Sequence, residues 1–387
     1  MFQMIYLDNH ATTACDPRVV QAMLPFFTAH YGNAASPHGF GFQAAAAVAQ
    51  AREEVASLLG AQAEEIIFTS GATEANNLAI LGIAQKHQRL GGRRRRIVTT
   101  AIEHKSVTEP CQYLAELGWD IIYVPVNQKG IVDEQEATKL ITDDTLLVSI
   151  QAANSEIGTI QAVQRLAAIA HERGALLHCD AAQAIGKISV SVTDWEVDLL
   201  SLSGHKLYGP KGVGALFLRG GAKQLPLVPL MRGGTQEYAL RPGTTPVPLL
   251  IGLGMACHLA EAELSEDRDR IIQLRDDLEG RILHALPFVR RNGCEQNRLP
   301  NNSSLTFSGI EADALLANLP NLAISTGSAC EAGSLDPSRV LINIGLSSSD
   351  AFCTLRFGLG RFTTADEVEH AAHQIVTACT KLALLLD

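Results

Sequence analysis

The chain contains few aromatic and few charged residues. Phenylalanine, tyrosine and tryptophan make up 5% of its 387 residues and the charged residues 19%, whereas hydrophobic residues reach 47%. This composition is typical of a well-buried globular enzyme and excludes a disordered chain. The formal net charge of -10 argues against nucleic acid or an anionic membrane as a partner. The one basic run, residues 93–96, follows two glycines and is typical of a solvated loop.

Signals for export, membrane insertion and metal binding are also missing. No apolar run approaches the roughly 20 residues of a membrane span, and the N-terminus lacks the basic start and apolar core of a signal peptide. The eight cysteines form no CxxC pair and no compact cluster with histidine. Neither a metal site nor a disulfide framework is therefore indicated, and we expect a cytoplasmic protein.

Short apolar runs alternate with helix-like segments between about residues 65 and 220. The runs lie at 66–68, 97–100, 121–124, 146–150, 175–179, 197–202 and 215–218, and helices are expected at 74–88, 106–117 and 163–173. Continuous apolar strands separated by amphipathic helices predict an α/β fold with a largely parallel sheet covered on both faces.

The length of the chain predicts roughly two domains. Helical pattern at 249–262 and 267–283 is followed by short strands at 305–307 and 354–357 and by helices at 312–319 and 365–386. This second part is typical of a smaller α+β domain. We expect a large domain over residues 15–255 and a small one formed by 1–14 and 256–387.

Polar residues follow the predicted strands at the point where each strand ends. They include the stretch 70–73, then His104, Asn154, Asp180 and Gln183, and finally Ser203, His205 and Lys206. Because ligands of parallel α/β sheets bind beyond the carboxyl ends of the strands, we expect one assembled site.

The residue types suggest what this site does. A lysine at the end of a buried strand is partly desolvated, so Lys206 is a candidate for Schiff-base formation, although a surface lysine in a turn fits the same pattern. Asp180 suits a protonated heteroaromatic nitrogen or, alternatively, a helix cap. The stretch 70–73 opens a helix and suits an anion or an ordinary cap. His104 suits ring stacking or proton transfer, or a structural role.

Two further candidates lie late in the chain. Cys330 is flanked by small residues and glycines, which are typical of a solvent-reachable loop, and it is the candidate thiol nucleophile. Arg356 lies in an apolar strand and suits either a carboxylate clamp or a buried ion pair.

Taken together, these stretches resemble the cysteine desulfurases of the nitrogen-fixation and iron-sulfur-cluster assembly type, in the class V aminotransferase family of pyridoxal phosphate enzymes of fold-type I. The similarity covers nearly the whole chain and runs through YLDNHATT (6–13), FTSGATE (68–74), EHK (103–105), NSEIG (154–158), SGHK (203–206), LRPGT (240–244), GSAC (327–330) and LRFGLGRF (355–362). Several such motifs in the right order are highly specific.

The resemblance implies a role for each candidate. Lys206 would hold pyridoxal 5'-phosphate as a Schiff base and move the substrate proton, Asp180 would pair with the ring nitrogen, Gln183 would bond the ring hydroxyl, and His104 would stack on the ring. The phosphate would be held by Ala72, Thr73, Ser203 and His205, with Thr244 from the other subunit of a homodimer. Asn154 and Arg356 would bind the substrate carboxylate.

The implied reaction converts L-cysteine to alanine and leaves a persulfide on Cys330, in a mobile loop of the small domain. The sulfur would then pass to acceptor proteins such as an iron-sulfur scaffold, or to thio-cofactor or tRNA synthesis. A related selenocysteine lyase or aminotransferase and a scaffold without catalysis remain alternatives. The chain departs from the family pattern at GGTQEY (233–238), NSEIG (154–158) and STGSAC (325–330), which affects the expected acceptor more than the reaction.

Overall fold

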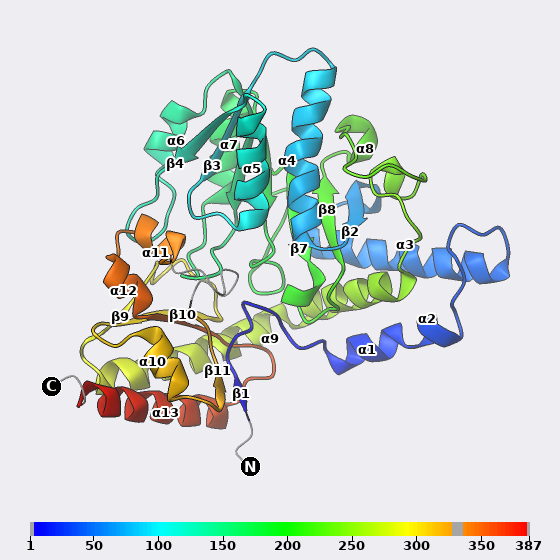
Figure 1. The fold of residues 1–387 in the computed structure, drawn as a ribbon. Helices are drawn as coiled ribbons and strands as arrows, with labels where there is room; N and C mark the ends of the chain where they lie inside the picture. The colour runs from blue at the N-terminus through cyan, green and yellow to red at the C-terminus, as the bar shows by residue number, and fades with distance from the viewer. Residues whose placement is uncertain (1–3, 327–335, 385–387) are drawn as a thin grey trace.

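A seven-stranded sheet with the order β2-β8-β7-β6-β5-β3-β4 lies at the centre of the larger part of the protein (Figure 1). The computed structural model describes residues 4–326 and 336–384. The strands are β2 (Ile66–Thr69), β3 (Arg96–Thr100), β4 (Asp120–Val124), β5 (Thr145–Gln151), β6 (Leu176–Asp180), β7 (Leu199–Ser203) and β8 (Gly214–Leu218). Only β8 pairs antiparallel, with β2 and with β7. The predicted largely parallel sheet is confirmed.

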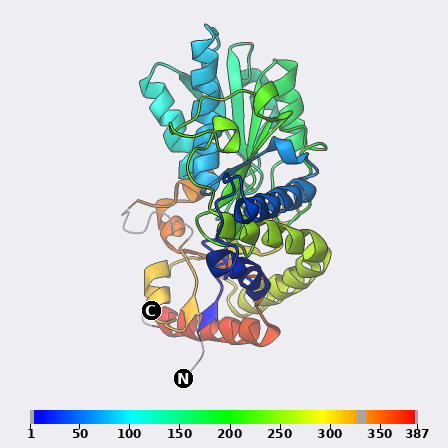
Figure 2. The same ribbon diagram turned by 90° about the vertical axis from the view of Figure 1, so that its right-hand side faces the viewer.

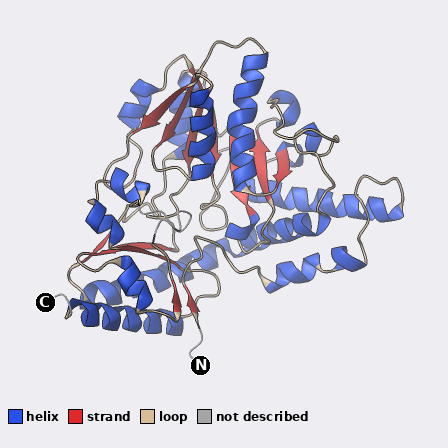
Figure 3. Cartoon of the chain, viewed as in Figure 1, coloured by secondary structure: helices blue, strands red, loops and turns tan. Residues whose placement is uncertain are grey.

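Helices cover both faces of this sheet, which explains why its strands are apolar throughout. Successive side chains of a strand point to opposite faces, so Leu199 lies in one hydrophobic core and Leu200 in another. The first core contains α4 (Ala72–Arg89) and α5 (Lys105–Glu116), and the second contains α7 (Val163–Glu172). Figure 3 shows the helices on either side of the strands. The shorter helices α6 (Glu134–Leu140) and α8 (Gly221–Gln224) and the turn η1 (Ala63–Glu65) lie around its rim.

A single helix, α9 (Val247–Ala285), joins the two parts of the protein. Its first half packs in the core of the large sheet through Leu253 and Cys257, and its second half packs in a separate core through Leu278 and Ile282. The two helical segments expected from the sequence are thus one continuous helix of 39 residues. It contains an 18-residue window with a mean hydropathy of 1.4, which is enough by length and composition to cross a membrane. The expectation that no such run exists was therefore wrong, but half of that window is buried against the rest of the protein.

Three N-terminal helices lie along α9: α1 (Pro17–Met23), α2 (Pro25–Thr28) and α3 (Gly39–Leu59). Figure 2 shows α3 and α9 side by side. The two helices approach closely because Gly254 faces Ala51: a Cβ atom on Gly254 would lie 2.7 Å from the Cα atom of Ala51. Helix α3 was not predicted from the sequence, because its buried face consists mostly of alanine and glycine and gives a weak apolar pattern.

The smaller part of the protein is built on an antiparallel sheet with the order β12-β10-β9. Its strands are β9 (Val289–Arg291), β10 (Asn302–Phe307) and β12 (Thr354–Gly358), and its helices are α10 (Ala312–Ala317), α11 (Arg339–Asn343), α12 (Ser348–Phe352) and α13 (Ala365–Ala383). The N-terminal strand β1 (Ile5–Tyr6) pairs with β11 (Leu322–Ala323), and Ile5 and Leu7 lie in this core. Residues 5–7 therefore pack with this smaller part of the protein.

Candidate active site

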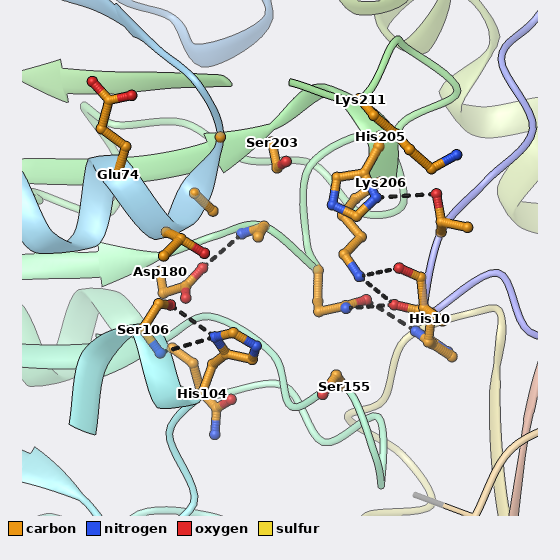
Figure 4. A pocket seen from close by; sticks show the side chains of 18 of the residues that line it. His10, Glu74, His104, Ser106, Ser155, Asp180, Ser203, His205, Lys206 and Lys211 are labelled. Carbon is orange, nitrogen blue, oxygen red and sulfur yellow. Dashed lines mark hydrogen bonds between the residues drawn. The ribbon is translucent and has the colours of Figure 1, made fainter. Parts of the chain in front are cut away.

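The carboxyl ends of β2, β3, β6 and β7 surround a cavity of about 500 Å³. Most of the residues predicted from the sequence line it: Ala72, Thr73, His104, Asp180, Gln183, Ser203, His205, Lys206 and Arg356 (Figure 4). The strand-end rule therefore predicts the location of this pocket. Asn154 and Thr244 do not line it, and Cys330 lies outside the described residues.

Lys206 ends the short turn η2 (Gly204–Lys206) that directly follows β7. Its Nζ atom donates to the carbonyl oxygens of His10, at 2.5 Å, and Ala11, at 2.8 Å (Figure 4). A second lysine lies behind it: Lys187 is 6% exposed and donates from Nζ to the carbonyl oxygen of Lys206. Burial and the positive charge of Lys206 lower the pKa of Lys187 to about 7. The N-terminal segment thus positions the amine of Lys206 at the carboxyl ends of the strands.

Asp180 is the last residue of β6, and the residue is 7% exposed. Oδ1 accepts from the backbone N–H of Ala182 at 3.0 Å, and Oδ2 accepts from Nδ2 of Asn76 at 2.7 Å. Among residues 4–326 and 336–384, no lysine, arginine or histidine forms an ion pair with it. A buried carboxylate held by two neutral donors is suited to binding a cationic group that enters the cavity.

His104 caps α5 and is exposed toward the cavity. Its Nδ1 atom lies 2.7 Å from Oγ of Ser106 and accepts from the backbone N–H of Ser106 at 3.1 Å. Figure 4 shows the imidazole and Asp180 on the same side of the pocket, with Ser106 between them. The ring is therefore positioned by its own helix cap.

His10 lines the cavity and was not among the predicted site residues. Its Nδ1 lies 3.0 Å from Oε1 of Gln183, and its Nε2 lies 3.1 Å from Nδ2 of Asn302. Gln183 in turn donates from Nε2 to the carbonyl oxygen of His10 at 3.1 Å. Burial and the Arg356 guanidinium hold the pKa of His10 well below its usual range. The neutral ring therefore orients the amide of Gln183. The polar residues that follow β1 are the sequence feature that could have indicated this role for His10.

One end of the cavity presents donors suited to an anion. Gly71 precedes α4, an 18-residue helix whose first turn carries Ala72 and Thr73. Ser203 faces this turn, since a Cβ atom on Gly71 would lie 3.6 Å from its Oγ. His205 lies beside them with Nδ1 3.1 Å from Oγ1 of Thr12, and burial and nearby lysines lower its pKa to about 4. Helix N–H groups, hydroxyls and a neutral imidazole together match a phosphate.

Arg356 lies at the other end of the cavity, and the residue is 4% exposed. It pairs with Asp8 at 2.9 Å and donates to the carbonyl oxygen of Ser155 at 3.3 Å. Asn154 lies next to Ser155 but supports the loop: its Nδ2 donates to the carbonyl oxygen of Ile102, and its Oδ1 accepts from the N–H groups of Glu156 and Ile157. The structure thus brings Arg356 to the pocket and places Asn154 behind its wall.

The remaining predicted features lie away from the cavity. Thr244 is exposed on the loop before α9. In the basic run, Arg94 donates to the carbonyl oxygen of Thr145, Arg95 packs over Trp119, and Arg96 pairs with Asp120. These arginines make contacts within the protein, while Arg93 is exposed.

Comparisons with known proteins agree on the family. The family model for aminotransferase class-V matches residues 5–370. The cysteine desulfurase IscS of Rickettsia typhi is 44% identical over 382 residues, covering 98% of this chain and 92% of the relative. The cysteine desulfurase IscS of Ehrlichia chaffeensis is also 44% identical, over 378 residues and with the same coverage.

Solved structures give the same result. A NifS-like protein superimposes with a TM-score of 0.91 at 37% identity, covering 98% of this chain and 100% of that chain. A structure described as SspA in complex with cysteine has a TM-score of 0.82 at 37% identity, covering 93% of this chain and 99% of that one. The chain therefore belongs to the class-V aminotransferase family, among its pyridoxal phosphate-dependent cysteine desulfurases.

Proposed function

We propose that this protein removes sulfur from L-cysteine, releases alanine and carries the sulfur as a persulfide on Cys330. The observation that carries the proposal is the layout of one cavity. The amine of Lys206, the carboxylate of Asp180, which has no cationic partner among the described residues, and the turn before α4 face the same space. Few ligands besides pyridoxal 5'-phosphate combine an aldehyde, a protonated ring nitrogen and a phosphate.

The residues present fit this cofactor. Asp180 needs a cation, which the ring nitrogen provides, and the neutral donors around Ser203 need an anion, which the phosphate provides. We propose that Lys206 would hold the cofactor through its aldehyde group, that Gln183 would bond the ring hydroxyl and that His104 would stack on the ring. Ala72, Thr73, Ser203 and His205 hold the phosphate, with Thr244 contributed by the other subunit. When bound, the cofactor draws electrons away from the Cα atom of the amino acid.

The chain's own side chains then handle protons and orientation. Lys206 would be the base for the substrate Cα proton, and its amine is oriented by the carbonyl oxygens of His10 and Ala11. Arg356 binds the substrate carboxylate in a bidentate manner, with its present partner Asp8 orienting it. We also propose a substrate contact for Asn154, although its amide must first exchange its bond to the carbonyl oxygen of Ile102.

The sulfur step uses Cys330. Its thiolate attacks the substrate sulfur, a new S–S bond forms, and the Cβ–S bond breaks with its electron pair left on the carbon. Protonation of that carbon gives alanine, so one cysteine and one thiol become one alanine and one persulfide. We propose that the persulfide sulfur then passes to an acceptor protein such as an iron-sulfur scaffold.

We further propose a cytoplasmic homodimer with domains at 15–255 and at 1–14 plus 256–387. Exposed aromatic residues on α2, on α3 and in the loop between them support a second copy as partner: Phe27 is 58% exposed, Tyr31 69% and Phe42 64%. The separate hydrophobic cores joined by α9 support the division into domains.

A single-turnover assay tests the function. Purified protein loaded with pyridoxal phosphate is mixed with L-cysteine, and alanine, persulfide and keto acid are measured. We expect one alanine and one persulfide per site, and no persulfide from Cys330→Ala. Keto acid as the main product would indicate an aminotransferase. Faster turnover of selenocysteine, undiminished in Cys330→Ala, would indicate a selenocysteine lyase.

A further inference from the structure

Asn76 connects two site residues from a position that no solvent reaches. It lies on the inner face of α4 and is 0% exposed. Its Nδ2 atom donates to Oδ2 of Asp180 at 2.7 Å and to Oγ of Ser106 at 2.8 Å. Ser106 in turn contacts Nδ1 of His104. One buried chain of hydrogen bonds therefore runs from Asp180 through Asn76 and Ser106 to His104.

The direction of each bond follows from the donors and acceptors available. A carboxylate only accepts, so the nitrogen and not the oxygen of the Asn76 amide faces Asp180. That nitrogen has two hydrogens, and the second one points to Oγ of Ser106. Because Oγ accepts there, the hydroxyl hydrogen of Ser106 is available for Nδ1 of His104.

The backbone fixes the same direction independently. The N–H group of Ser106 donates to Nδ1 of His104 at 3.1 Å. With two donors aimed at it, Nδ1 carries a lone pair and no proton. A neutral His104 must then carry its proton on Nε2.

We infer that Asn76 and Ser106 are positioning residues that hold His104 as the Nε2–H tautomer and fix the rotation of the Asp180 carboxylate. The inference rests on the proposed function, in which both side chains contact the cofactor. It makes neutral His104 a hydrogen-bond donor at Nε2 toward a bound group, and it leaves Nδ1 unavailable as a base.

The amide of Asn76 has no equivalent alternative orientation. Turning it over would place its oxygen against the carboxylate of Asp180 and remove both donated bonds at once. Its Oδ1 atom has no hydrogen-bond partner among the described residues, so nothing compensates for that loss. The bridge is therefore specific for an amide, and an aspartate of the same shape at residue 76 cannot replace it.

Nitrogen-15 NMR of the cofactor-loaded protein, labelled at histidine, tests the tautomer directly. The signal of His104 is assigned by its absence in His104→Gln. We expect a protonated Nε2 and a hydrogen-bonded, unprotonated Nδ1. In Ser106→Ala the backbone N–H keeps the tautomer, but the Nδ1 signal moves toward that of a less strongly bonded nitrogen. A proton on Nδ1 in the unmodified protein, or an unchanged Nδ1 signal in Ser106→Ala, overturns the inference.

Cofactor affinity tests the second half. Titration of the cofactor-free protein with pyridoxal phosphate, followed by absorbance, gives a dissociation constant without turnover. We expect Asn76→Asp and Asn76→Ala to raise it at least tenfold. Asn318→Ala, which removes an exposed side-chain bond at the C-terminal end of α10, should leave it unchanged. Circular dichroism establishes that each variant is folded. Unchanged affinity in folded Asn76→Ala removes the positioning role, while failure of the unmodified protein to form alanine refutes only the proposed function.

Discussion

The buried ammonium group of Lys187 donates a hydrogen bond to the main-chain carbonyl oxygen of Lys206, with 3.0 Å between Nζ and O. The two lysines thus lie next to each other: Lys206 lines the cavity, and Lys187 is buried beside it, outside the cavity lining. Among the described residues, Lys187 has no acidic partner. Its amine donates to a main-chain carbonyl oxygen, while burial and the charge of Lys206 disfavour the ammonium form, so its protonation is sensitive to pH.

Replacing Lys187 with methionine is expected to stabilise the protein near pH 7. The folded-state pKa of Lys187 is about 7 and the ordinary value is 10.5, so between these values the unfolded chain binds one more proton and stability rises with pH. The cost of the buried charge is greatest below pH 7. Urea unfolding should show that Lys187→Met raises the free energy of unfolding by about 1–3 kcal/mol at pH 6.5. Up to pH 9, the stability of this variant should depend less on pH than that of the unmodified protein. The exposed Lys381→Met serves as control, and an identical pH dependence in both variants would contradict the expectation.

Replacing Glu103 with glutamine is expected to have the opposite pH signature. Burial, opposed by a hydrogen bond from Thr100 and reinforced by Asp180, raises the pKa of Glu103 to about 8. The folded protein holds a proton that the unfolded chain loses above pH 4.5, so this group's contribution to stability is lost as pH rises toward 8. Glu103→Gln should match the unmodified protein near pH 4.5 and exceed it by about 2–4 kcal/mol at pH 8.5. Glu109→Gln, exposed on α5, should show no such divergence in urea titrations at several pH values.

Arg356→Lys is expected to weaken substrate binding without loss of the cofactor. A lysine keeps the charge but cannot form two parallel hydrogen bonds to a carboxylate. Steady-state alanine formation should show KM for L-cysteine raised about 10- to 100-fold, while the visible absorbance of the bound cofactor stays the same. If the absorbance is lost together with activity, Arg356 has a structural role through its pair with Asp8.

Gly214→Ala is expected to disrupt the anion-binding end of the cavity. A Cβ atom there would lie 2.4 Å from the carbonyl oxygen of Leu202 and 2.7 Å from the Cα atom of Gly71. Strand β8 or the turn before α4 must move, at a cost of about 1–3 kcal/mol. Thermal unfolding and cofactor titration should both show the loss. Gly280→Ala, whose added Cβ meets nothing within 4 Å inside α9, should instead be neutral or slightly stabilising.

The residues that could be predicted from the sequence are those placed by strand ends. Asp180, Ser203 and Lys206 each follow an apolar run, and parallel pairing brings such ends to one edge. The local hydrophobic pattern and the strand-end rule are sufficient to predict these three residues. The same rule also selected Asn154, which follows β5 but turns its amide into the loop. Position after a strand does not determine which way a side chain points.

The residues that were missed depend on packing between distant segments. His10 reaches the cavity because β1 pairs with β11, more than three hundred residues away. Asn76 reads as an ordinary helix position, and only the approach of α4 to β6 brings it to Asp180. Helix α3 was missed because alanine packs well against a glycine on α9 without a strong apolar stripe. Predicting each of these features requires knowing which distant segment packs against it, and a local sequence pattern does not contain that information.

The N-terminal segment also sets the order in which the site can be completed during synthesis. Leu7 donates to the carbonyl oxygen of Ala323 and Asn9 to that of Gly358, so the segment can dock only after residue 358 has left the ribosome. Until then the contacts of residues 10–13 with Gln183 and His205 position the carbonyl groups of His10 and Ala11. The nascent large sheet can therefore fold early, while the segment that contacts Lys206 completes its docking late in translation.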